Sequence, residues 1–312
     1  MNYINLYAKF LNKFLNPQKE LKVVFDSSNG TTGLVLKKIR HSRLKTILLN
    51  DRPDGNFPAH GPNPMADKAS SELQIKVKTE KADLGIIFDA DGDRAFFIDD
   101  KGRMISSDII SYLLIHSIKP KKAIIDARSG WLLRRHLDKK TKILECRVGH
   151  FFIKKLMRKT GTEFAGERSG HYYFPALGGS APHGKNTIYF DSGIIAAIQA
   201  INAASQLPFK LSNYIDLLPR YYESPELNFK TKNGHRLMDA IERIYRNKTD
   251  KISHLDGLSA EMKSITTGGE WWFNLRTSNT EPTIRLNIEA DSKKLLDLKT
   301  KELEKVISHL EY

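Results

Sequence analysis

The sequence predicts an α/β protein in which two related mixed α/β domains, with sheets covered by helices, precede a smaller α+β C-terminal domain. A short repeat relates the first two domains. Lys22–Gly30 reads KVVFDSSNG and Lys122–Gly130 reads KAIIDARSG, with Lys, an apolar triplet, Asp and Gly in register. Apolar runs of strand length alternate with helical patterns through both halves, which is typical of βαβ units.

Length and composition predict more than one domain in a soluble chain. A chain of 312 residues can bury more than one core, since single cores stop growing near this size. We expect domains at 1–118, 119–222 and 223–312. The composition is 40% hydrophobic, and no uninterrupted apolar run approaches a membrane span, so we expect no membrane partner. Cys146 stands alone and lysines interrupt the first apolar segment, which favours a cytoplasmic protein without a secretory leader.

The net charge of +14 raises the question of nucleic-acid binding. The lysines are scattered along the chain, and neither an arginine-rich tail nor a zinc-finger or RNA-recognition signature is present. A lysine-rich surface that serves an anionic small substrate explains the same charge. We therefore expect no nucleic-acid partner.

Local patterns define the elements of the first domain. Apolar residues at helical spacing predict an amphipathic helix over 3–15. Further strands are expected at 21–26, 46–49, 84–88 and 95–98, with helices from about 31 and over 107–118. A loop rich in Pro and Gly, 51–64, lies between the strands expected at 46–49 and 84–88. His60 in this loop could be a ligand, but a histidine in a surface loop is more often solvated, and we assign it no role.

The remaining elements follow in the same way. Helices are expected at 151–159, 191–204, 235–246 and 292–309, the second of them with an Asp or Ser cap. Strands are expected at 269–276 and 283–289. A stretch of Pro, Tyr and Glu over 218–225 predicts a linker.

The loop after the apolar run IIF indicates a cation site. Asp89, Asp91 and Asp93 alternate in DADGDR, and three crowded carboxylates repel one another unless a cation neutralises them. Magnesium prefers such oxygen ligands and leaves positions open for a phosphate, whose oxygen Arg94 suits. A solvated acidic turn is the alternative. An EF-hand is excluded because Arg94 and Asp100 occupy the positions that need Gly and Glu.

Two segments of the second domain carry polar groups suited to a ligand. In AGERSGHYYF, Glu167, Ser169 and His171 alternate between glycines, a spacing that suits sugar hydroxyls. A polar hairpin without a ligand explains this segment equally well. In RVGH, from Arg147 to His150, a helix begins, and a phosphate can bind at such a helix start.

The last domain contains a candidate phosphate site in RTSNTEPTIR. Arginines give charge-assisted and often bidentate hydrogen bonds, and short polar side chains in a turn add donors. Glu281 could instead pair with the arginines. The residues expected to contact phosphate are Arg276, Ser278, Asn279, Thr280 and Arg285.

DADGDR, GERSGH and RTSNTEPTIR in this order, together with DSSNG and RVGH, resemble the α-D-phosphohexomutase family, specifically its second, third and fourth domains. SNTEP, WWFNLR and PDGNFP are most similar to bacterial phosphomannomutases. The resemblance implies interconversion of hexose 6-phosphate and hexose 1-phosphate, of mannose or glucose, through a hexose bisphosphate. Arg168 stands where most members have Met, outside the alternating residues.

The resemblance also implies individual roles. The three aspartates would bind Mg²⁺, and Arg94 would support phosphoryl transfer, with Arg147 and His150 as further catalytic residues. The GERSGH residues would hold the sugar, and the RTSNTEPTIR residues the phosphate that is not transferred.

One family feature is absent from the sequence. Members carry a TASHNP-like loop whose phosphoserine donates and recovers the phosphoryl group, and no such loop is found. The nearest Ser-His pairs, Ser253–His254 and Ser308–His309, are not followed by Asn-Pro. We expect a separate chain to supply the phosphoserine domain, or this gene model to have lost it. The alternative is a non-catalytic module that binds sugar phosphate and magnesium.

Overall fold

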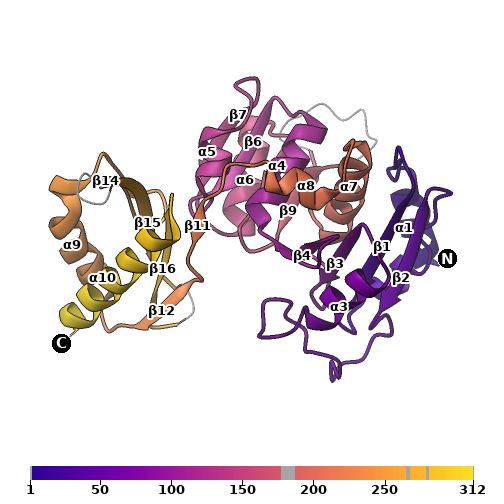
Figure 1. The fold of residues 1–312 in the computed structure, drawn as a ribbon, viewed down its shortest axis with the longest axis horizontal. Coiled ribbons are helices and arrows are strands. Elements are labelled where there is room, and N and C mark those ends of the chain that lie inside the picture. The colour runs from indigo at the N-terminus through magenta and orange to yellow at the C-terminus, as the bar shows by residue number, and fades with distance from the viewer. Residues whose placement is uncertain (1, 177–186, 265–267, 279–280, 312) are drawn as a thin grey trace. The chain divides into compact units, whose positions relative to one another are not determined.

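The computed structural model describes residues 2–176, 187–264, 268–278 and 281–311. The chain forms two compact units (Figure 1). The first consists of Met1–Ile125, His136–Leu144 and Ile153–Leu218, and the second of Asp126–Arg135, Glu145–Phe152 and Pro219–Tyr312.

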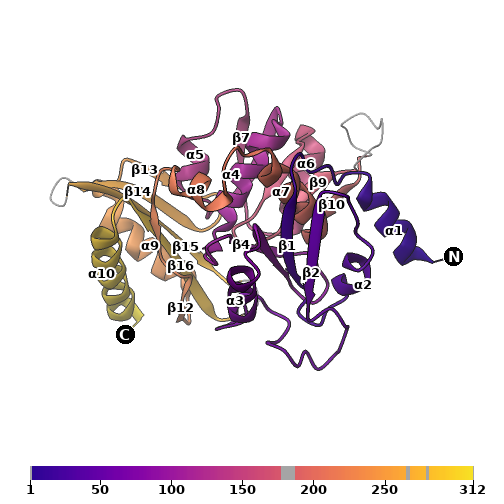
Figure 2. The ribbon, with the colours of Figure 1, turned by 45° about the vertical axis from the view of Figure 1, so that its right-hand side comes forward.

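The first sheet of the first unit is mixed. Its strand order is β2-β1-β3-β4-β5, with β1 parallel to β2 and β3, and with antiparallel pairing from β3 onward. Strand β3 is buried along its whole length, as its uninterrupted apolar run requires. Helix α3 packs on β1 and β3, while α1 packs against α2 (Figure 2). The bounds are α1 Tyr3–Asn12, β1 Leu21–Asp26, α2 Thr32–Leu36, β2 Leu44–Leu49, α3 Ser71–Thr79, β3 Leu84–Phe88, β4 Ala95–Asp99 and β5 Met104–Ile105.

The second sheet has the strand order β10-β9-β8-β6-β7 and is also mixed, since β6 and β8 are parallel whereas β8, β9 and β10 pair antiparallel. The ends of β6 and β7 pass into the second unit. The bounds are β6 Lys122–Asp126, α5 Trp131–Arg135, β7 Lys142–Cys146, α6 His150–Thr160, β8 Phe164–Gly166, β9 Tyr172–Pro175, β10 Tyr189–Asp191 and α8 Leu211–Asp216.

Two helices join the sheets of the first unit. Helices α4 (Ser107–Ile118) and α7 (Gly193–Gln206) pack against each other; α4 contacts β4 and β8, and α7 contacts β3, β4 and β9. Both are buried over most of their circumference, and both are capped by a serine, Ser106 or Ser192, whose hydroxyl accepts a backbone hydrogen bond. The end of α7 that carries Ser192 also faces the candidate site described below.

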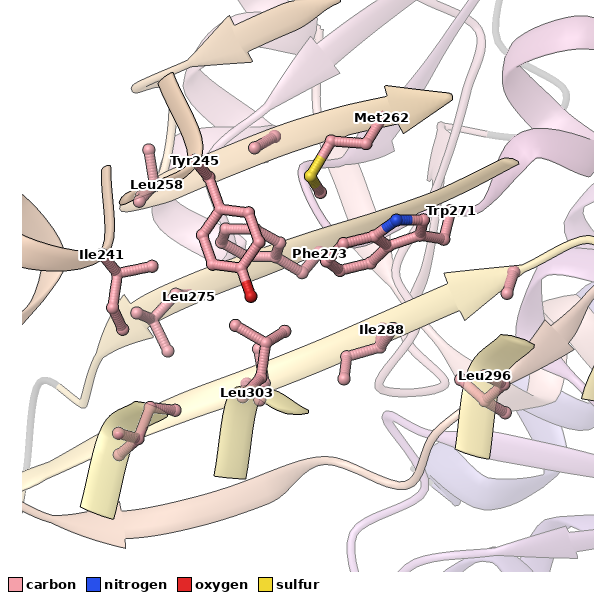
Figure 3. Packing of buried hydrophobic residues seen from close by; sticks show 14 of the residues in the cluster. Ile241, Tyr245, Leu258, Met262, Trp271, Phe273, Leu275, Ile288, Leu296 and Leu303 are labelled. Carbon is pink, nitrogen blue, oxygen red and sulfur yellow. The ribbon is translucent and has the colours of Figure 1, made fainter. Parts of the chain in front are cut away.

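The second unit contains a six-stranded sheet in the order β11-β16-β15-β14-β13, with β12 also paired to β16. Its core lies between this sheet and helices α9 and α10 (Figure 3). Tyr245 of α9 meets the rings of Trp271 and Phe273 edge-on at 5.8 and 5.5 Å between centroids. The bounds are β11 Tyr222–Glu223, β12 Leu227–Lys230, α9 Gly234–Tyr245, a 3-10 turn Arg246–Lys248, β13 Lys251–Ser253, β14 Leu258–Ser264, β15 Gly269–Thr277, β16 Thr283–Ala290 and α10 Lys293–Glu311.

The predicted fold class is confirmed, since two mixed sheets covered by helices precede an antiparallel sheet that packs against helices α9 and α10. Helix α4 has the predicted bounds. Helix α1 ends at Asn12 rather than at residue 15, because the Asn12 side chain bonds the backbone at Lys38 and Arg40 and Pro17 follows shortly. The predicted linker over 218–225 contains strand β11. No helix in the described part of the chain is long and apolar enough to cross a membrane.

Candidate functional site

The acidic loop begins where buried strand β3 ends. Asp89 is 3% exposed, and its Oδ1 accepts hydrogen bonds from the backbone N–H groups of Gly92 and Arg94 at 3.1 and 3.2 Å. Its Oδ2 accepts a 2.6 Å hydrogen bond from Nε of Arg94. Asp89 therefore folds the loop back on itself and fixes the Arg94 side chain beside the carboxylates.

The three carboxylates come close enough to share a cation. Asp89, Asp91 and Asp93 offer oxygen atoms that all lie within 4.8 Å of one another. Burial raises the pKa of Asp93 to about 7; the charge of His171 opposes this rise, and the charges of Asp89 and Asp91 add to it. A divalent cation would relieve this repulsion, and an all-oxygen donor set suits magnesium. The donor set therefore fits the predicted metal.

The acidic loop is held by backbone contacts to two other segments of the first unit. Arg94 and His171 form an antiparallel β-bridge, and the N–H of Ala95 donates to the carbonyl of Gly170 at 3.1 Å. On the other side the N–H of Gly193, in the first turn of α7, donates to the carbonyl of Gly92 at 3.0 Å. These contacts bring the GERSGH segment to the acidic loop.

His171 lies at the junction of the two loops. Its Nδ1 is 3.2 Å from Asp191 and 3.7 Å from Asp93. Burial lowers the pKa of His171, but the hydrogen bond to Asp191 and the surrounding carboxylates leave it raised above its ordinary value. Asp93, His171 and Asp191 also bring potential metal ligands within 4.8 Å of one another. Because magnesium prefers oxygen, the aspartate set suits it better.

The other two residues predicted to bind sugar lie in the turn between β8 and β9. Glu167 is 2% exposed, and its carboxylate accepts a short hydrogen bond from the Tyr173 hydroxyl. Ser169 is half-buried within the same turn, which closes with the N–H of Gly170 donating to the Glu167 carbonyl. The structure thus brings His171 to the acidic loop and directs Glu167 onto Tyr173.

A second cluster, in the second unit, gathers the arginines of the RTSNTEPTIR segment. Arg276 and Arg285 are opposite each other on β15 and β16. Both bond the carboxylate of Glu226, at 3.1 and 3.2 Å, and Arg128 approaches the same carboxylate at 3.7 Å. Burial lowers the pKa of Arg276, as does the charge of Arg128, while Glu226 opposes this. Three guanidinium groups thus converge on one carboxylate.

The remaining predicted residues have more varied positions. Ser278 lies at the end of the arginine cluster, where its hydroxyl accepts from Arg285 at 3.4 Å. Asn279 and Thr280 lie outside the described residues. Arg147 is half exposed, with Nε 3.5 Å from Asp256, and His150 is exposed at the first residue of α6.

One sequence interpretation is wrong. His60 is not solvated: its side chain is 9% exposed, and Nε2 lies 3.1 Å from the fully buried carboxylate of Asp26. That carboxylate also accepts from the N–H of Ser28 and from the Asn50 amide. His60 therefore brings the loop over 51–64 to the end of β1 and gives the buried carboxylate of Asp26 a partner.

Sequence reasoning also missed three residues of the two clusters. Glu226 directly follows the segment interpreted as a linker, and Asp191 was considered only as a helix cap. Arg128 had a usable signal, since it occupies the position of Ser28 in the repeat, directly after a strand that ends in Asp. In both copies the aspartate accepts from the N–H two residues on, and Arg128 adds its guanidinium.

Comparison with known proteins decides the family. Family models described as phosphoglucomutase/phosphomannomutase α/β/α domain II, α/β/α domain III and C-terminal domain match residues 2–102, 106–221 and 226–305. The chain belongs to the phosphoglucomutase/phosphomannomutase family. The predicted resemblance is thereby confirmed.

Individual relatives agree with this assignment. The chain is 34% identical to a phosphomannomutase of Methanocaldococcus jannaschii over 100% of this chain and 66% of the relative, and 33% identical to one of Vibrio cholerae over 98% and 66%. The chain thus spans about two thirds of the length of these curated relatives.

Solved structures show the same fold. A phosphoglucomutase/phosphomannomutase family protein of Burkholderia thailandensis matches with a TM-score of 0.81 at 25% identity, over 98% of this chain and 64% of that one. Aspergillus fumigatus N-acetylphosphoglucosamine mutase, solved in complex with GlcNAc-6P and magnesium, matches with a TM-score of 0.65 over 99% and 65%. At 13% identity the latter shows the fold alone.

Proposed function

We propose that this chain provides the metal-binding, sugar-binding and phosphate-binding parts of a phosphohexomutase that interconverts hexose 6-phosphate and hexose 1-phosphate of mannose or glucose. The observation that carries the proposal is the pairing of Arg94 with His171, which joins a carboxylate cluster suited to magnesium to the segment expected to hold sugar. Phosphoryl transfer depends mainly on positioning and on charge neutralisation, which such a site supplies.

Each group of residues has a role in this proposal. Magnesium would be held by Asp89, Asp91 and Asp93 and would neutralise the phosphoryl group in transfer. Arg94, fixed by Asp89, would contact the same group. Glu167, Ser169 and His171 would hold sugar hydroxyls. The phosphate that is not transferred would be held by Arg276, Ser278, Asn279, Thr280 and Arg285, with Arg147 and His150 in supporting catalytic roles.

The phosphoserine that starts the family's reaction must come from outside the segments matched here. We propose that a further domain supplies it, on a separate chain or in a longer form of this protein, and that the sugar passes through a hexose bisphosphate. We retain 1–118, 119–222 and 223–312 as the three domains of this chain, and a cytoplasmic location, which its single cysteine favours.

A coupled assay tests the proposal. Mannose 1-phosphate and glucose 1-phosphate are offered with magnesium and a hexose bisphosphate primer, to this chain alone and after addition of a separately expressed phosphoserine domain. Turnover that requires both proteins is the expected result. Without turnover in either case, binding of sugar phosphate by calorimetry would favour the alternative, a non-catalytic sugar-phosphate and magnesium binding module.

A further inference from the structure

The arginine cluster of the second unit contains an acidic residue that the proposed reaction does not use. Glu226 directly precedes strand β12, and its carboxylate lies 3.1 Å from Arg276 and 3.2 Å from Arg285. Nη1 of Arg128 is 3.7 Å away, and the Asn287 amide donates at 3.4 Å. Three cations and one amide therefore converge on an anion that belongs to the chain itself.

This set of donors is one that a phosphate would also use. Arginine forms charge-assisted hydrogen bonds with carboxylate and phosphate oxygens in the same planar geometry. Within the described residues, Nε of Arg276 and Nε of Arg285 are buried without a hydrogen-bond partner. A group with more acceptor oxygens than a carboxylate would satisfy more of these donors.

The charge of the arginine cluster also suits a phosphate ligand. Arg128, Arg276 and Arg285 carry three positive charges. The buried carboxylate of Asp126, 2.8 Å from Arg128, balances one of them, and Glu226 reduces the sum from two to one. A phosphate monoester carries a charge of about −1.5 to −2 at neutral pH. Burial raises the pKa of Glu226, but the three arginines leave it lowered overall, so the residue stays ionised at neutral pH.

We propose that Glu226 is a built-in competitor for the phosphate group: it occupies the arginine cluster when no ligand is bound and weakens the hold of the cluster on phosphate. The inference rests on the proposed function, in which the cluster binds a sugar phosphate. Each turnover then requires the phosphate to leave the cluster again. Without Glu226 the cluster would carry two positive charges and would retain a dianion, whereas Glu226 offers the arginines a replacement partner at the moment of release.

A purely structural role for Glu226 predicts the opposite effect of mutation. If the carboxylate only keeps the three guanidinium groups in place, its neutralisation lets them repel one another and weakens phosphate binding. If it competes, neutralisation strengthens binding. The sign of the change therefore separates the two roles.

The test compares the full chain with the variant Glu226→Gln, which keeps the size of the side chain and removes its charge. Inorganic phosphate and mannose 1-phosphate are titrated by calorimetry at pH 7.5 without a divalent metal. We expect the Kd for both to fall about tenfold, because arginine bonds to a charged acceptor of this kind are among the stronger ones in proteins. Glu270→Gln is the matched control: it removes one charge from the same unit at a carboxylate that pairs with Arg135, and its Kd should equal that of the parent.

The outcomes are distinguishable. If the parent binds neither phosphate compound, the proposed function of the cluster fails and the competitor role fails with it. If the parent binds and Glu226→Gln, with a native circular dichroism spectrum, binds equally or more weakly, the competitor role alone is overturned. If Glu226→Gln does not fold, the test uses Glu226→Asp, whose shorter side chain keeps the charge but moves it away from the arginines. Tighter phosphate binding than in the parent then supports competition, and equal or weaker binding refutes it.

Discussion

Arg94 and His171 pair through their backbones, so the loop whose aspartates are expected to bind metal and the loop expected to hold the sugar are joined as if they were neighbouring strands. The next residues extend the contact, since the N–H of Ala95 donates to the Gly170 carbonyl at 3.1 Å. Because these contacts are made by backbone atoms, substitutions of the side chains at the junction should not separate the loops. A substitution that changes the backbone conformation at Gly170 should separate them.

Gly170→Ala should separate these two loops. Gly170 has φ +88°, and an added Cβ would lie 2.7 Å from the ring of Phe96, which is fixed in the core. The left-handed conformation and the overlap together should cost about 2 to 4 kcal/mol. Thermal unfolding followed by circular dichroism measures this loss, and calorimetry should show weaker magnesium binding. Gly55→Ala is the control, because nothing lies within 4 Å of the new Cβ. It should leave the thermal stability and the magnesium affinity unchanged.

Asp91→Ala should reduce metal binding without affecting folding. Asp91 is exposed, so its removal should change the free energy of unfolding by less than about 0.5 kcal/mol. It is also one of three carboxylates within 4.8 Å, so calorimetric titration with Mg²⁺ or Mn²⁺ should show a large loss of affinity. Asp67→Ala removes another exposed acid from a different loop and should bind metal as the parent does. Equal metal binding in Asp91→Ala and the parent would exclude the aspartate site.

The parts of the fold that the sequence predicted well are those encoded by short contiguous patterns. Strand β3 follows from an apolar run bounded by Gly and Asp, and α4 from a helical pattern of apolar residues over 107–118. The clustering of the three carboxylates in the acidic loop was predicted equally well, because the aspartates alternate within five residues. In these cases the residues that determine the structure are also neighbours in the sequence.

The parts that the sequence did not predict depend on contacts between distant residues. His60 meets Asp26 across 34 positions, and Glu226 meets Arg276 and Arg285 across 50 and 59. His60 stands in a loop and Glu226 follows a proline, and in neither case does a local sequence pattern identify the residue that pairs with it. Such pairs can be identified only from the folded structure, which shows which residues lie beside a buried charge. A buried charge requires a compensating partner.

The His60–Asp26 pair predicts a specific pH dependence of stability. The hydrogen bond to Asp26 raises the pKa of His60, burial opposes the rise, and the net shift is upward. A group whose pKa is raised on folding stabilises the folded state fully below its unfolded pKa, about 6.5 for histidine, and this contribution is lost as the pH rises through the folded value. His60→Gln keeps an N–H donor and removes the charge. It should therefore destabilise the protein more at pH 5.5 than at pH 8.5.

Chemical denaturation followed by far-UV circular dichroism at the two pH values measures this difference. Tryptophan fluorescence is unsuitable, because Trp131, Trp271 and Trp272 all belong to the second unit and His60 to the first. His254→Gln is the control, since His254 pairs with Glu242 on the surface and its side chain is 63% exposed. A pH-independent effect of His60→Gln would show that the charge of His60 does not stabilise the fold.

The carboxylate of Glu289 predicts a change that tryptophan fluorescence can report. Glu289 is 1% exposed, and Oε2 accepts from the N–H of Trp131 at 2.9 Å and from the indole N–H of Trp272 at 2.5 Å. A carboxylate is the stronger acceptor for both donors, so Glu289→Gln should lower the free energy of unfolding by about 1 to 3 kcal/mol and shift the emission of Trp272. Glu270→Gln, at a carboxylate whose side chain is 35% exposed, should cost less than about 1 kcal/mol. If the two variants unfold at the same denaturant concentration, Glu289 does not anchor α5 to the sheet.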